Sequence, residues 1–380
     1  MAKGAYIGVG GVAKKIKKGY IGVDGVARKI KKAYIGIGGV ARPCWSGGGL
    51  EYYGTITPLS VARAPTATTI GNYALFAGGA TKNAVDSYDT SLTHSNPTAL
   101  SIARNKSAAT TIGSHALFAG GFASTNYYDT VDAYDTSLTR STITALSVAR
   151  QGAAATTIGN YALFGGGMAK TGSVGSAPNS TVDAYDTSLT RSTAENLSSV
   201  KNGVASTTIG NYALFAGGIG STSSTYYDTV DVYDTSLTRS TASALSVARQ
   251  SAAATTIGDY ALVVGGYTYA SSKYTCYDAI DVYDASLTRS NPTVLSLGRY
   301  NAGATTISKY ALFAGGNTGG MAYNSTVDVY DTSLTRSTIT ALSVARDSAG
   351  ATTIGNYALF AGGTNGYNKS SDAVDAYAIG

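Results

Sequence analysis

Seven aspartates recur along the chain at nearly regular intervals, and their carboxylates are the groups most able to do chemistry. They are Asp86, Asp132, Asp183, Asp231, Asp281, Asp328 and Asp375. Carboxylates can act as general acids and bases, or bind calcium. An active site, however, is normally built once in a chain, whereas this aspartate is present in every repeat. We therefore expect it to stabilise each repeat through turn and inter-repeat hydrogen bonds. The same expectation holds for the recurring basic residue at Arg63, Arg104, Arg150, Lys201, Arg249, Arg299 and Arg346.

Histidine and cysteine, the usual ligands of transition metals, are too few to build a metal site. His94 stands where a later repeat has Arg140, and His115 stands where the other repeats have tyrosine. With both histidines at such architectural positions, no Ser-His-Asp triad can be argued. Cys44 and Cys276 lie in different modules, so no disulfide framework is expected, which fits folding in a reducing cytosol. The sequence predicts no metal, no cofactor and no catalytic residue.

The element that must position these residues is an apolar run ending on glycines, such as Tyr-Ala-Leu-Phe-Gly-Gly-Gly at 161–167. Close copies place Gly-Gly pairs at 78–79, 120–121, 166–167, 217–218, 265–266, 315–316 and 362–363, so that successive pairs are 42 to 51 residues apart. A period of this size indicates a propeller or a solenoid. The glycine pairs end strands and open no helix, which argues against a phosphate-binding loop.

One full repeat spans residues 151–200 and predicts four short strands. We place them at 154–158, 161–164, 181–185 and in a region leading through Leu197. Four strands at this period are typical of a propeller blade. The small Ala and Thr residues of the first strand suit a crowded central channel, and the unbroken apolar second strand indicates burial on both faces.

The two ends of the repeat region complement each other. The chain stops at Gly380, after the third strand of the seventh repeat, while 54–63 matches the fourth-strand segment 141–150. Pairing the two ends would remove an open sheet edge. The sequence thus predicts an all-β fold, with a seven-bladed β-propeller over 52–380 closed by an N-terminal strand.

A basic arm at 1–42 precedes the propeller, followed by a glycine-rich linker at 43–51. The arm holds ten Lys or Arg and one acid, whereas the remaining residues hold 18 basic and 21 acidic, which is a net −3. Apolar runs that begin at Tyr6, Tyr20 and Tyr34 and continue after Gly-Gly or Asp-Gly predict three β-hairpins. The basic residues, with Lys14, Lys17, Arg28 and Lys31 as representatives, could bind nucleic acid or an anionic membrane, or could protect strand edges. We favour a docking or oligomerisation module over nucleic acid.

The repeat resembles the kelch repeat, in which an apolar strand ending in Gly-Gly is followed by a variable loop, a Val-x-x-Tyr-Asp strand and a later Arg. The resemblance covers roughly 330 residues, and it implies a kelch-like seven-bladed propeller. These repeats lack the tryptophan that kelch repeats usually carry after Tyr-Asp, which places the chain in a divergent branch. The arm resembles N-terminal segments of virion proteins, of the tail type, from bacteriophages and prophages of Gram-positive gut bacteria.

The repeats differ from one another mainly in the loops after Gly-Gly and in the residues after each recurring Arg or Lys. An up-and-down blade places both segments on one face and the uniform turns on the other. The variable segments are rich in Tyr, Ser, Asn and Gly, as antibody loops are. Unconstrained drift is the alternative, but drift would also have altered the uniform turns. The candidate ligand-binding residues are Asn105, Asn126, Tyr127, Tyr128, Gln151, Tyr226, Tyr227, Gln250, Tyr267, Tyr269, Tyr274, Tyr300, Tyr323 and Tyr367.

These patterns predict a non-enzymatic, virion-associated protein of a phage or prophage, assembled in the cytoplasm of the bacterial host. The arm would anchor it to other virion proteins, as a homo-oligomer on the particle, and the variable face would bind a host-surface protein or glycan. A structural decoration protein and a glycan-active enzyme are the alternatives. No secretory signal is expected, and no apolar stretch approaches the ~18 residues of a membrane span.

Overall fold

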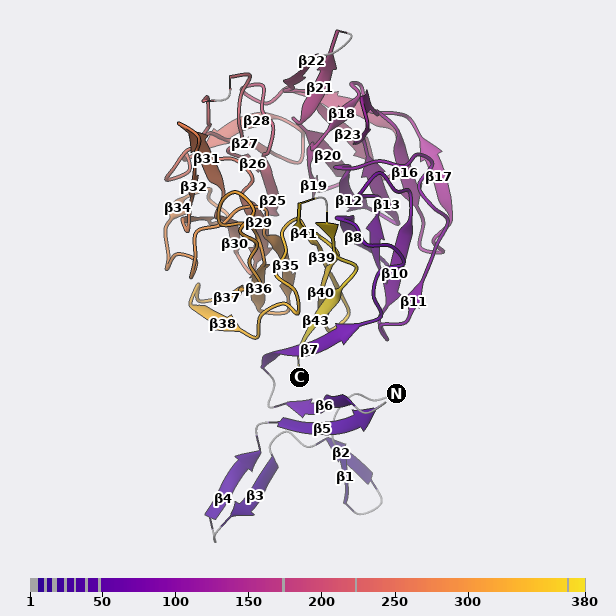
Figure 1. The fold of residues 1–380 in the computed structure, drawn as a ribbon, viewed down its shortest axis with the longest axis vertical. Coiled ribbons are helices and arrows are strands. Elements are labelled where there is room, and N and C mark those ends of the chain that lie inside the picture. Colours follow the sequence, from indigo (N-terminus) through magenta and orange to yellow (C-terminus); the bar gives the residue numbers. More distant parts are fainter. Residues whose placement is uncertain are drawn as a thin grey trace.

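The computed structural model describes residues 6–9, 12–15, 19–23, 26–30, 32–37, 40–46, 49–172, 175–222, 224–367 and 369–379. Over these residues the protein is all-β, with many four-stranded antiparallel sheets and no helix, which confirms the predicted class (Figure 1). The arrangement fits a β-propeller. We number the four-stranded sheets 1 to 7 by the order of their first strands.

The strands of each sheet follow one another as an antiparallel meander. Sheet 1 holds β8 (Thr66–Ile70), β9 (Tyr73–Ala77), β10 (Val85–Asp89) and β11 (His94–Ser95); sheet 2 holds β12 (Ala108–Ile112), β13 (His115–Ala119), β16 (Val131–Tyr134) and β17 (Arg140–Ile143). Sheet 3 holds β19 (Ala154–Ile158), β20 (Tyr161–Gly165), β23 (Val182–Asp186) and β24 (Arg191–Ala194); sheet 4 holds β25 (Ala205–Ile209), β26 (Tyr212–Ala216), β27 (Val230–Tyr233) and β28 (Arg239–Ala242). Sheet 5 holds β29 (Ala253–Ile257), β30 (Tyr260–Val264), β33 (Ile280–Tyr283) and β34 (Arg289–Ser290); sheet 6 holds β35 (Gly303–Ile307), β36 (Tyr310–Ala314), β37 (Val327–Asp331) and β38 (Arg336–Ile339). Sheet 7 combines β39 (Gly350–Ile354), β40 (Tyr357–Ala361) and β43 (Val374–Ile379) with β7 (Leu50–Ile56) from the other end of the region.

The fourth strand differs from the prediction. In sheet 3 it is β24, which begins directly after a tight turn, and Leu197 lies beyond its end. The turn is short because Leu189 adopts a positive φ of 63° and its N–H donates to the carbonyl of Asp186 at 2.9 Å. Leu197 is instead buried in the connection to the next sheet, with 4% of its surface exposed.

The pairing of the two ends is present, but with different strand limits from those predicted. β7 pairs antiparallel with β43, from Ile56 opposite Val374 to Leu50 opposite Ile379. The strand therefore lies at 50–56, and most of the predicted 54–63 segment forms a connection. The predicted linker at 43–51 is also mostly strand, because β6 (Val40–Ser46) extends through Trp45 and β7 starts at Leu50.

Neighbouring sheets meet through their first strands, which contact one another from β8 and β12 onward and return from β39 to β8. The threonines of these strands link the sheets, whereas the sequence predicted only that small residues would suit a crowded centre. Oγ1 atoms of adjacent sheets lie 2.6–2.9 Å apart in the pairs Thr68–Thr111, Thr110–Thr157, Thr156–Thr208, Thr207–Thr256, Thr255–Thr306, Thr305–Thr353 and Thr352–Thr69. The second threonine of each sheet also donates to the backbone carbonyl of its counterpart in the preceding sheet.

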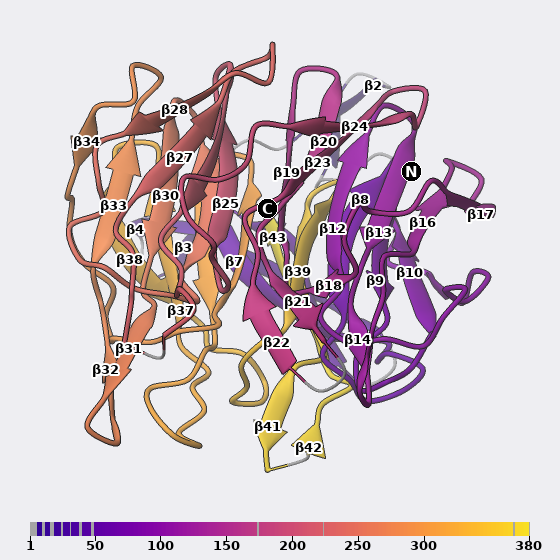
Figure 2. The same ribbon diagram turned by 90° about the horizontal axis from the view of Figure 1, so that it is seen from above.

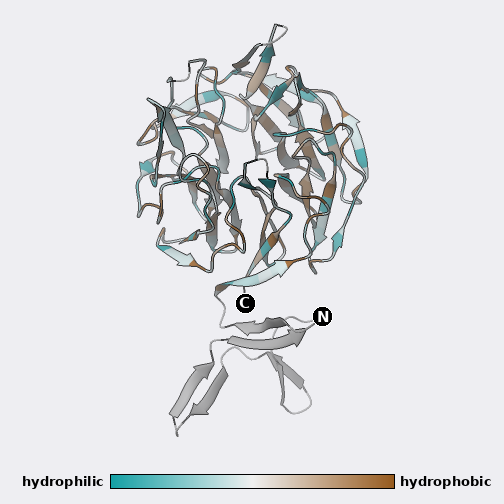
Figure 3. Cartoon of the chain, viewed as in Figure 1, coloured by the Kyte–Doolittle hydropathy of each residue, from teal (hydrophilic) through white to brown (hydrophobic). Residues whose placement is uncertain are grey.

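The second strands are buried on both faces, as their unbroken apolar pattern predicted. Leu117 of sheet 2, for example, packs with Phe164 and Tyr185 of sheet 3, and all three are fully buried. Phe164 and Tyr185 meet edge to face, with ring centroids 5.8 Å apart. In Figure 3 the hydrophobic residues lie mainly along the strands of the sheets. The core is thus a set of layers between neighbouring sheets, each able to bury apolar surface without a helix.

Three antiparallel hairpins precede the sheets, as the arm sequence predicted. They pair β1 (Tyr6–Val9) with β2 (Val12–Lys15), β3 (Gly19–Val23) with β4 (Val26–Ile30), and β5 (Lys32–Ile37) with β6. Among the candidate arm residues, Tyr6, Tyr20 and Tyr34 lie on the first strand of their hairpins, and Lys14 and Arg28 lie on returning strands. Lys17 and Lys31 lie outside the described residues.

Candidate functional site

The recurring basic residues and aspartates form buried ion pairs between neighbouring sheets. Arg104, in the connection that leaves sheet 1, donates from Nη2 to Asp132 Oδ2 of sheet 2 at 2.8 Å, and both side chains are fully buried. The same nitrogen donates to the carbonyl of Phe118 at 3.0 Å. Arg140 approaches the other carboxylate oxygen, with Nη1 3.0 Å from Oδ1. The repeated pairs are Arg63–Asp86, Arg104–Asp132, Arg150–Asp183, Lys201–Asp231, Arg249–Asp281, Arg299–Asp328 and Arg346–Asp375. The prediction that these residues serve the architecture is confirmed.

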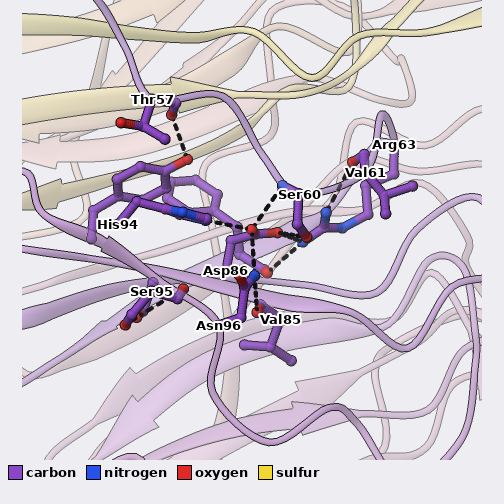
Figure 4. Close-up of polar contacts among 12 residues, drawn as sticks. Thr57, Ser60, Val61, Arg63, Val85, Asp86, His94, Ser95 and Asn96 are labelled. Atoms are coloured by element: carbon purple, nitrogen blue, oxygen red, sulfur yellow. Dashed lines mark hydrogen bonds and ion pairs between the residues drawn. The ribbon is translucent and has the colours of Figure 1, made fainter.

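In sheet 1, His94 contacts the recurring aspartate, Asp86. Figure 4 shows Asp86 surrounded by Arg63, the backbone N–H of Ser60, His94 and Asn96. His94 Nε2 lies 2.6 Å from Asp86 Oδ1 and so takes the place of Arg140 in sheet 2, as its sequence position predicted. Burial favours the neutral carboxyl group, but the hydrogen bonds from His94 and Ser60 and the Arg63 charge outweigh it and lower the pKa of Asp86. The Asp86 carboxylate therefore stays ionised within this network.

The Gly-Gly pairs end the second strands because a connection passes directly over them. Gly120 and Gly121 have φ of 63° and 112°, and a Cβ on Gly120 would lie 2.5 Å from the carbonyl oxygen of Arg150. The Gly121 N–H donates to that same carbonyl at 2.8 Å. A side chain here would clash with the backbone, and the positive φ would strain it. Each Gly-Gly pair is therefore required because the connection that leaves the sheet, such as the one with Arg150, passes too close for a side chain.

The loops after these glycines pair with the connections that precede their sheets. The residue after the basic residue bonds to the residue after Gly-Gly: Asn105 N–H donates to the Phe122 carbonyl at 2.8 Å, and Phe122 N–H returns a bond at 2.9 Å. Equivalent bridges join Asn202 with Ile219, Gln250 with Tyr267, Tyr300 with Asn317 and Asp347 with Thr364, and β18 (Arg150–Gln151) with β21 (Met168–Thr171). The two variable segments therefore lie side by side, a closer relation than the shared face that the sequence predicted.

These segments define one surface, which we call the loop face. It comprises the residues after each recurring basic residue and the loops at 80–84, 122–130, 168–181, 219–229, 267–279, 317–326 and 364–373. Short hairpins extend from several of these loops: β14 (Phe122–Ala123) with β15 (Asn126–Tyr127), β21 with β22 (Gly175–Pro178), β31 (Tyr267–Ala270) with β32 (Lys273–Cys276), and β41 (Thr364–Gly366) with β42 (Lys369–Ser370). Figure 2 shows β22, β32, β41 and β42 projecting from the same side of the molecule.

Five of the candidate residues form a tyrosine cluster on the loop face: Tyr226, Tyr267, Tyr269, Tyr274 and Tyr300. The Tyr267 ring centroid lies 4.2 Å from that of Tyr300 and 5.5 Å from that of Tyr274, and the Tyr274 and Tyr300 rings are nearly parallel. Tyr269 packs on Tyr274 at 4.7 Å, and Tyr226 Oη accepts the Tyr269 N–H at 2.7 Å. Three sheets contribute, because Tyr226 follows sheet 4's second strand and Tyr300 precedes sheet 6.

The cluster has a buried base and an exposed rim. Tyr300 is only 8% exposed, whereas Tyr269 and Tyr274 are 40% and 38% exposed. Burial, with the neighbouring Tyr226 and Tyr274, raises the pKa of Tyr267 to about 12. An exposed ring with a polar hydroxyl can pack on the apolar face of a sugar and hydrogen-bond its hydroxyls. The buried rings hold the exposed ones in place and lower the entropy cost of binding.

Four further candidates make more local contacts. Gln151 Nε2 donates to Tyr127 Oη at 3.4 Å, and Asn105 Oδ1 accepts the N–H of Thr81 at 2.7 Å. Gln250 is 9% exposed and bridges Tyr267, so it supports the cluster from below.

The remaining candidates lie apart from the cluster. Tyr227 lies under Lys201, with Nζ 5.6 Å from its ring centre, and Tyr128 is half-buried. Tyr323 bridges Asn317, while Asn126 is exposed at the start of β15 and Tyr367 is 76% exposed. The structure therefore brings together only part of the predicted set.

Two lysines on the loop face, Lys106 and Lys369, were not among the predicted site residues. They line a hollow near the loop of sheet 1. The sequence signal that could have located it is the interval of 42 residues between the first two Gly-Gly pairs, which is the shortest in the chain.

The described residues contain no group of three or more His, Cys, Asp or Glu side chains placed to hold a metal ion. Cys276 is half-buried, and burial raises the pKa of its thiol. Across the part of the chain that the structure covers, no helix is long and apolar enough to cross a membrane.

Comparison with known proteins supports the fold alone. No family model and no curated protein matches the chain. Among the solved structures that resemble it is one described as the structure of YjhT, with a TM-score of 0.61 and 14% sequence identity over 75% of this chain and 99% of that one. A likeness at this identity is consistent with a β-propeller-like fold.

Proposed function

We propose that the seven sheets are the blades of a closed, seven-bladed, kelch-like β-propeller. The threonine hydrogen bonds between first strands support closure, since the last of them joins Thr352 of sheet 7 to Thr69 of sheet 1. The pairing of β7 with β43 supports it further, because it completes the seventh sheet with a strand from the start of the region. The same pairing covers the edge that β43 would otherwise leave open to another chain.

We propose that this ring is a non-enzymatic binding module whose loop face contacts a carbohydrate on a bacterial host surface. The observation that carries the proposal is the tyrosine cluster, which gathers five side chains from the loops of three sheets and exposes two of their rings. Rigid aromatic rings beside adaptable Ser, Thr and Asn groups are the composition of binding loops.

The contrast with the opposite face supports recognition over drift. There each turn after the third strand repeats one geometry, with Asp Oδ1 accepting two backbone N–H groups at 2.7–3.0 Å. The leucine of each turn has a positive φ between 59° and 65°. Solvent-exposed turns therefore keep one geometry in all six copies, while the loop face differs from sheet to sheet.

We propose in addition that the three hairpins of the arm anchor the propeller to other proteins of a phage or prophage virion. The support is the resemblance of the arm, its regular hairpin framework and a charge that separates it from the acidic sheet region. Several copies on one particle would raise the avidity of weak single contacts. In this proposal nucleic acid is not a partner, and the protein is assembled into virions in the host cytoplasm.

Binding to an array of bacterial surface glycans tests the binding module. The full chain should bind a subset of the glycans, and the Tyr269→Ala/Tyr274→Ala variant should bind them at least about tenfold more weakly, because exposed aromatic rings that become buried on binding dominate such contacts. Tyr367→Ala is the matched control, since it removes an exposed loop-face tyrosine outside the cluster and should change binding little. Equal loss in both variants, or in neither, contradicts the role of the cluster and favours a decoration protein.

Deletion of residues 1–42 tests the anchor. Particles assembled with the deleted chain should lose the propeller, as scored by electron microscopy and immunoblotting of purified particles. The unfolding midpoint of the deleted chain serves as the control and should match that of the full chain. Retention of the bare sheet region on particles would assign the anchor elsewhere.

A further inference from the structure

A hollow of about 640 Å³ opens on the loop face where sheets 7, 1 and 2 meet. It lies beside the loop of sheet 1, residues 80–84, which is the shortest loop after a Gly-Gly pair. The other loops are longer and begin with a residue that bridges the preceding connection. The short loop of sheet 1 therefore leaves open a space that the longer loops occupy in the other sheets.

A proline lies in the wall of the hollow where the other connections have a residue with a backbone N–H. In four of the other six connections the second residue after the basic residue donates its N–H to the previous connection. Ser348 N–H, for example, bonds the Asn301 carbonyl at 2.9 Å, and Asn301 N–H bonds the Ser251 carbonyl at 3.1 Å. Pro65 occupies that position before sheet 1 and has no N–H to donate to Ser348. Both Pro65 and Ser348 line the hollow.

The lining is rich in hydrogen-bond donors and positively charged. It includes Lys106 and Lys369, together with Thr81, Ser348 and Ser370, and none of the described residues that line it carries a carboxylate. Lys106 Nζ lies 5.9 Å from the centre of the Phe122 ring, which adds an apolar face to one wall.

Asp347, the acidic residue next to the lining residue Ser348, contacts Asn317 instead of the hollow. Asp347, next to Ser348, is 8% exposed, and burial raises the pKa of its carboxyl group. Its Oδ2 lies 3.5 Å from the amide nitrogen of Asn317. The hollow therefore keeps a positive charge that an anion would neutralise.

We propose that this hollow binds an anionic sugar, with its carboxylate or phosphate group held by Lys106 and Lys369. The hydroxyls of Ser348 and Ser370 would bond the sugar hydroxyls, and the Phe122 ring would contact the apolar face of the sugar. The volume lies within the range of about 300–1,000 Å³ that small-molecule sites occupy. This site goes beyond the proposed function, because the tyrosine cluster takes no part in it.

Calorimetric titration of the full chain with three sugars tests the site: glucuronic acid, glucose 6-phosphate and neutral glucose. We expect at least one of the two anions to bind, more weakly as salt rises, and glucose to bind at least tenfold more weakly. Binding of one anion alone identifies the acid group, and binding of both identifies a general anion site. Failure of both anions, or equal binding of glucose, overturns the proposal.

Matched variants locate the binding. Lys106→Gln and Lys369→Gln should each weaken the anion by roughly tenfold, because each removes a charge-assisted hydrogen bond. Lys309→Gln, an exposed lysine in a turn between first and second strands, should leave binding unchanged. Equal loss in all three variants, or in none, overturns the assignment.

The Tyr269→Ala/Tyr274→Ala variant separates this site from the proposed function. It should bind the sugar anion as tightly as the natural sequence while losing binding on the glycan array. A variant that loses both would mean that the hollow is part of the tyrosine site and would overturn its independence.

Discussion

The contacts between sheets and the contacts on the loop face come from the same repeats, yet they differ in how uniform they are. The buried ion pairs keep nearly one geometry, with 2.8 Å in Arg104–Asp132, 2.8 Å in Arg150–Asp183 and 2.7 Å in Arg346–Asp375. On the loop face no two loops are alike: sheets 4 to 6 gather tyrosines, while sheets 7, 1 and 2 surround a lysine-lined hollow. Seven-fold repetition therefore marks architecture in this protein, and departures from it mark candidate binding sites.

If the inter-sheet contacts carry the stability, alkaline pH should have the largest effect on it. Each sheet buries one tyrosine whose hydroxyl donates to a carbonyl of the preceding connection at 2.7–2.8 Å, namely Tyr88, Tyr134, Tyr185, Tyr233, Tyr283, Tyr330 and Tyr377. Burial, and then the nearby aspartate, raises the pKa of each above its ordinary value. Above pH ~10 the unfolded chain loses these protons and the folded chain keeps them, so the free energy of unfolding falls by about 1.4 kcal/mol per pH unit for each tyrosine.

Urea unfolding between pH 9.5 and 11.5 measures this slope. Tyr134→Phe should reduce the slope by the contribution of one tyrosine, although it also removes a hydrogen bond. A loop-face substitution such as Tyr367→Phe should leave the slope unchanged, since that side chain is 76% exposed. The same slope in all three proteins would contradict the assignment of the titration to the buried tyrosines.

The architecture was predictable from the sequence because each of its residues appears once in every sheet. Arg150 and Asp183 could be assigned a structural role before their contact was known, and the Gly-Gly pairs marked where each second strand ends. The fourth strands were misplaced because Leu197, an apolar residue, suggested a strand, whereas the tight turn at Leu189 starts the strand earlier. Its positive φ is carried by leucine, a residue that gives no turn signal.

The candidate site was predictable only as a face. That Tyr226 would meet Tyr269 depends on how the loops of two sheets lean toward each other, and no spacing along the chain encodes that. The hollow was missed because it results from a short loop and from the missing N–H of Pro65. The sequence was searched for side chains that could bind a ligand, whereas the hollow is signalled by a shorter loop and by a backbone N–H that Pro65 lacks.

Removing one partner of a buried ion pair should have the next largest effect. Asp132→Ala leaves the Arg104 guanidinium fully buried without its counter-charge, and we expect the free energy of unfolding to fall by about 3–5 kcal/mol. Asp135→Ala is the control within the same sheet, because its carboxylate caps a turn by accepting the N–H groups of Ser137 and Thr139 in exposed hydrogen bonds. We expect a cost of about 1 kcal/mol for the control. Equal costs in thermal or urea unfolding would mean that burial of the pair adds nothing.

The smallest expected effect concerns sheet 4, where a lysine stands in the place of the recurring arginine. Lys201 replaces the recurring arginine and reaches Asp231 at 2.7 Å and Thr229 at 2.8 Å. The arginines at this position also donate to a second-strand carbonyl, as Arg249 does to Val263 at 3.2 Å. Lys201→Arg should restore that hydrogen bond and raise the free energy of unfolding by about 0.5–1.5 kcal/mol. Lys170→Arg, at an exposed position in the loop of the preceding sheet, is the control and should change it by less than about 0.5 kcal/mol. A loss of stability in Lys201→Arg would indicate that sheet 4 has repacked around the lysine ammonium group. The buried ion pair would then accept lysine as well as the arginine that the other sheets carry.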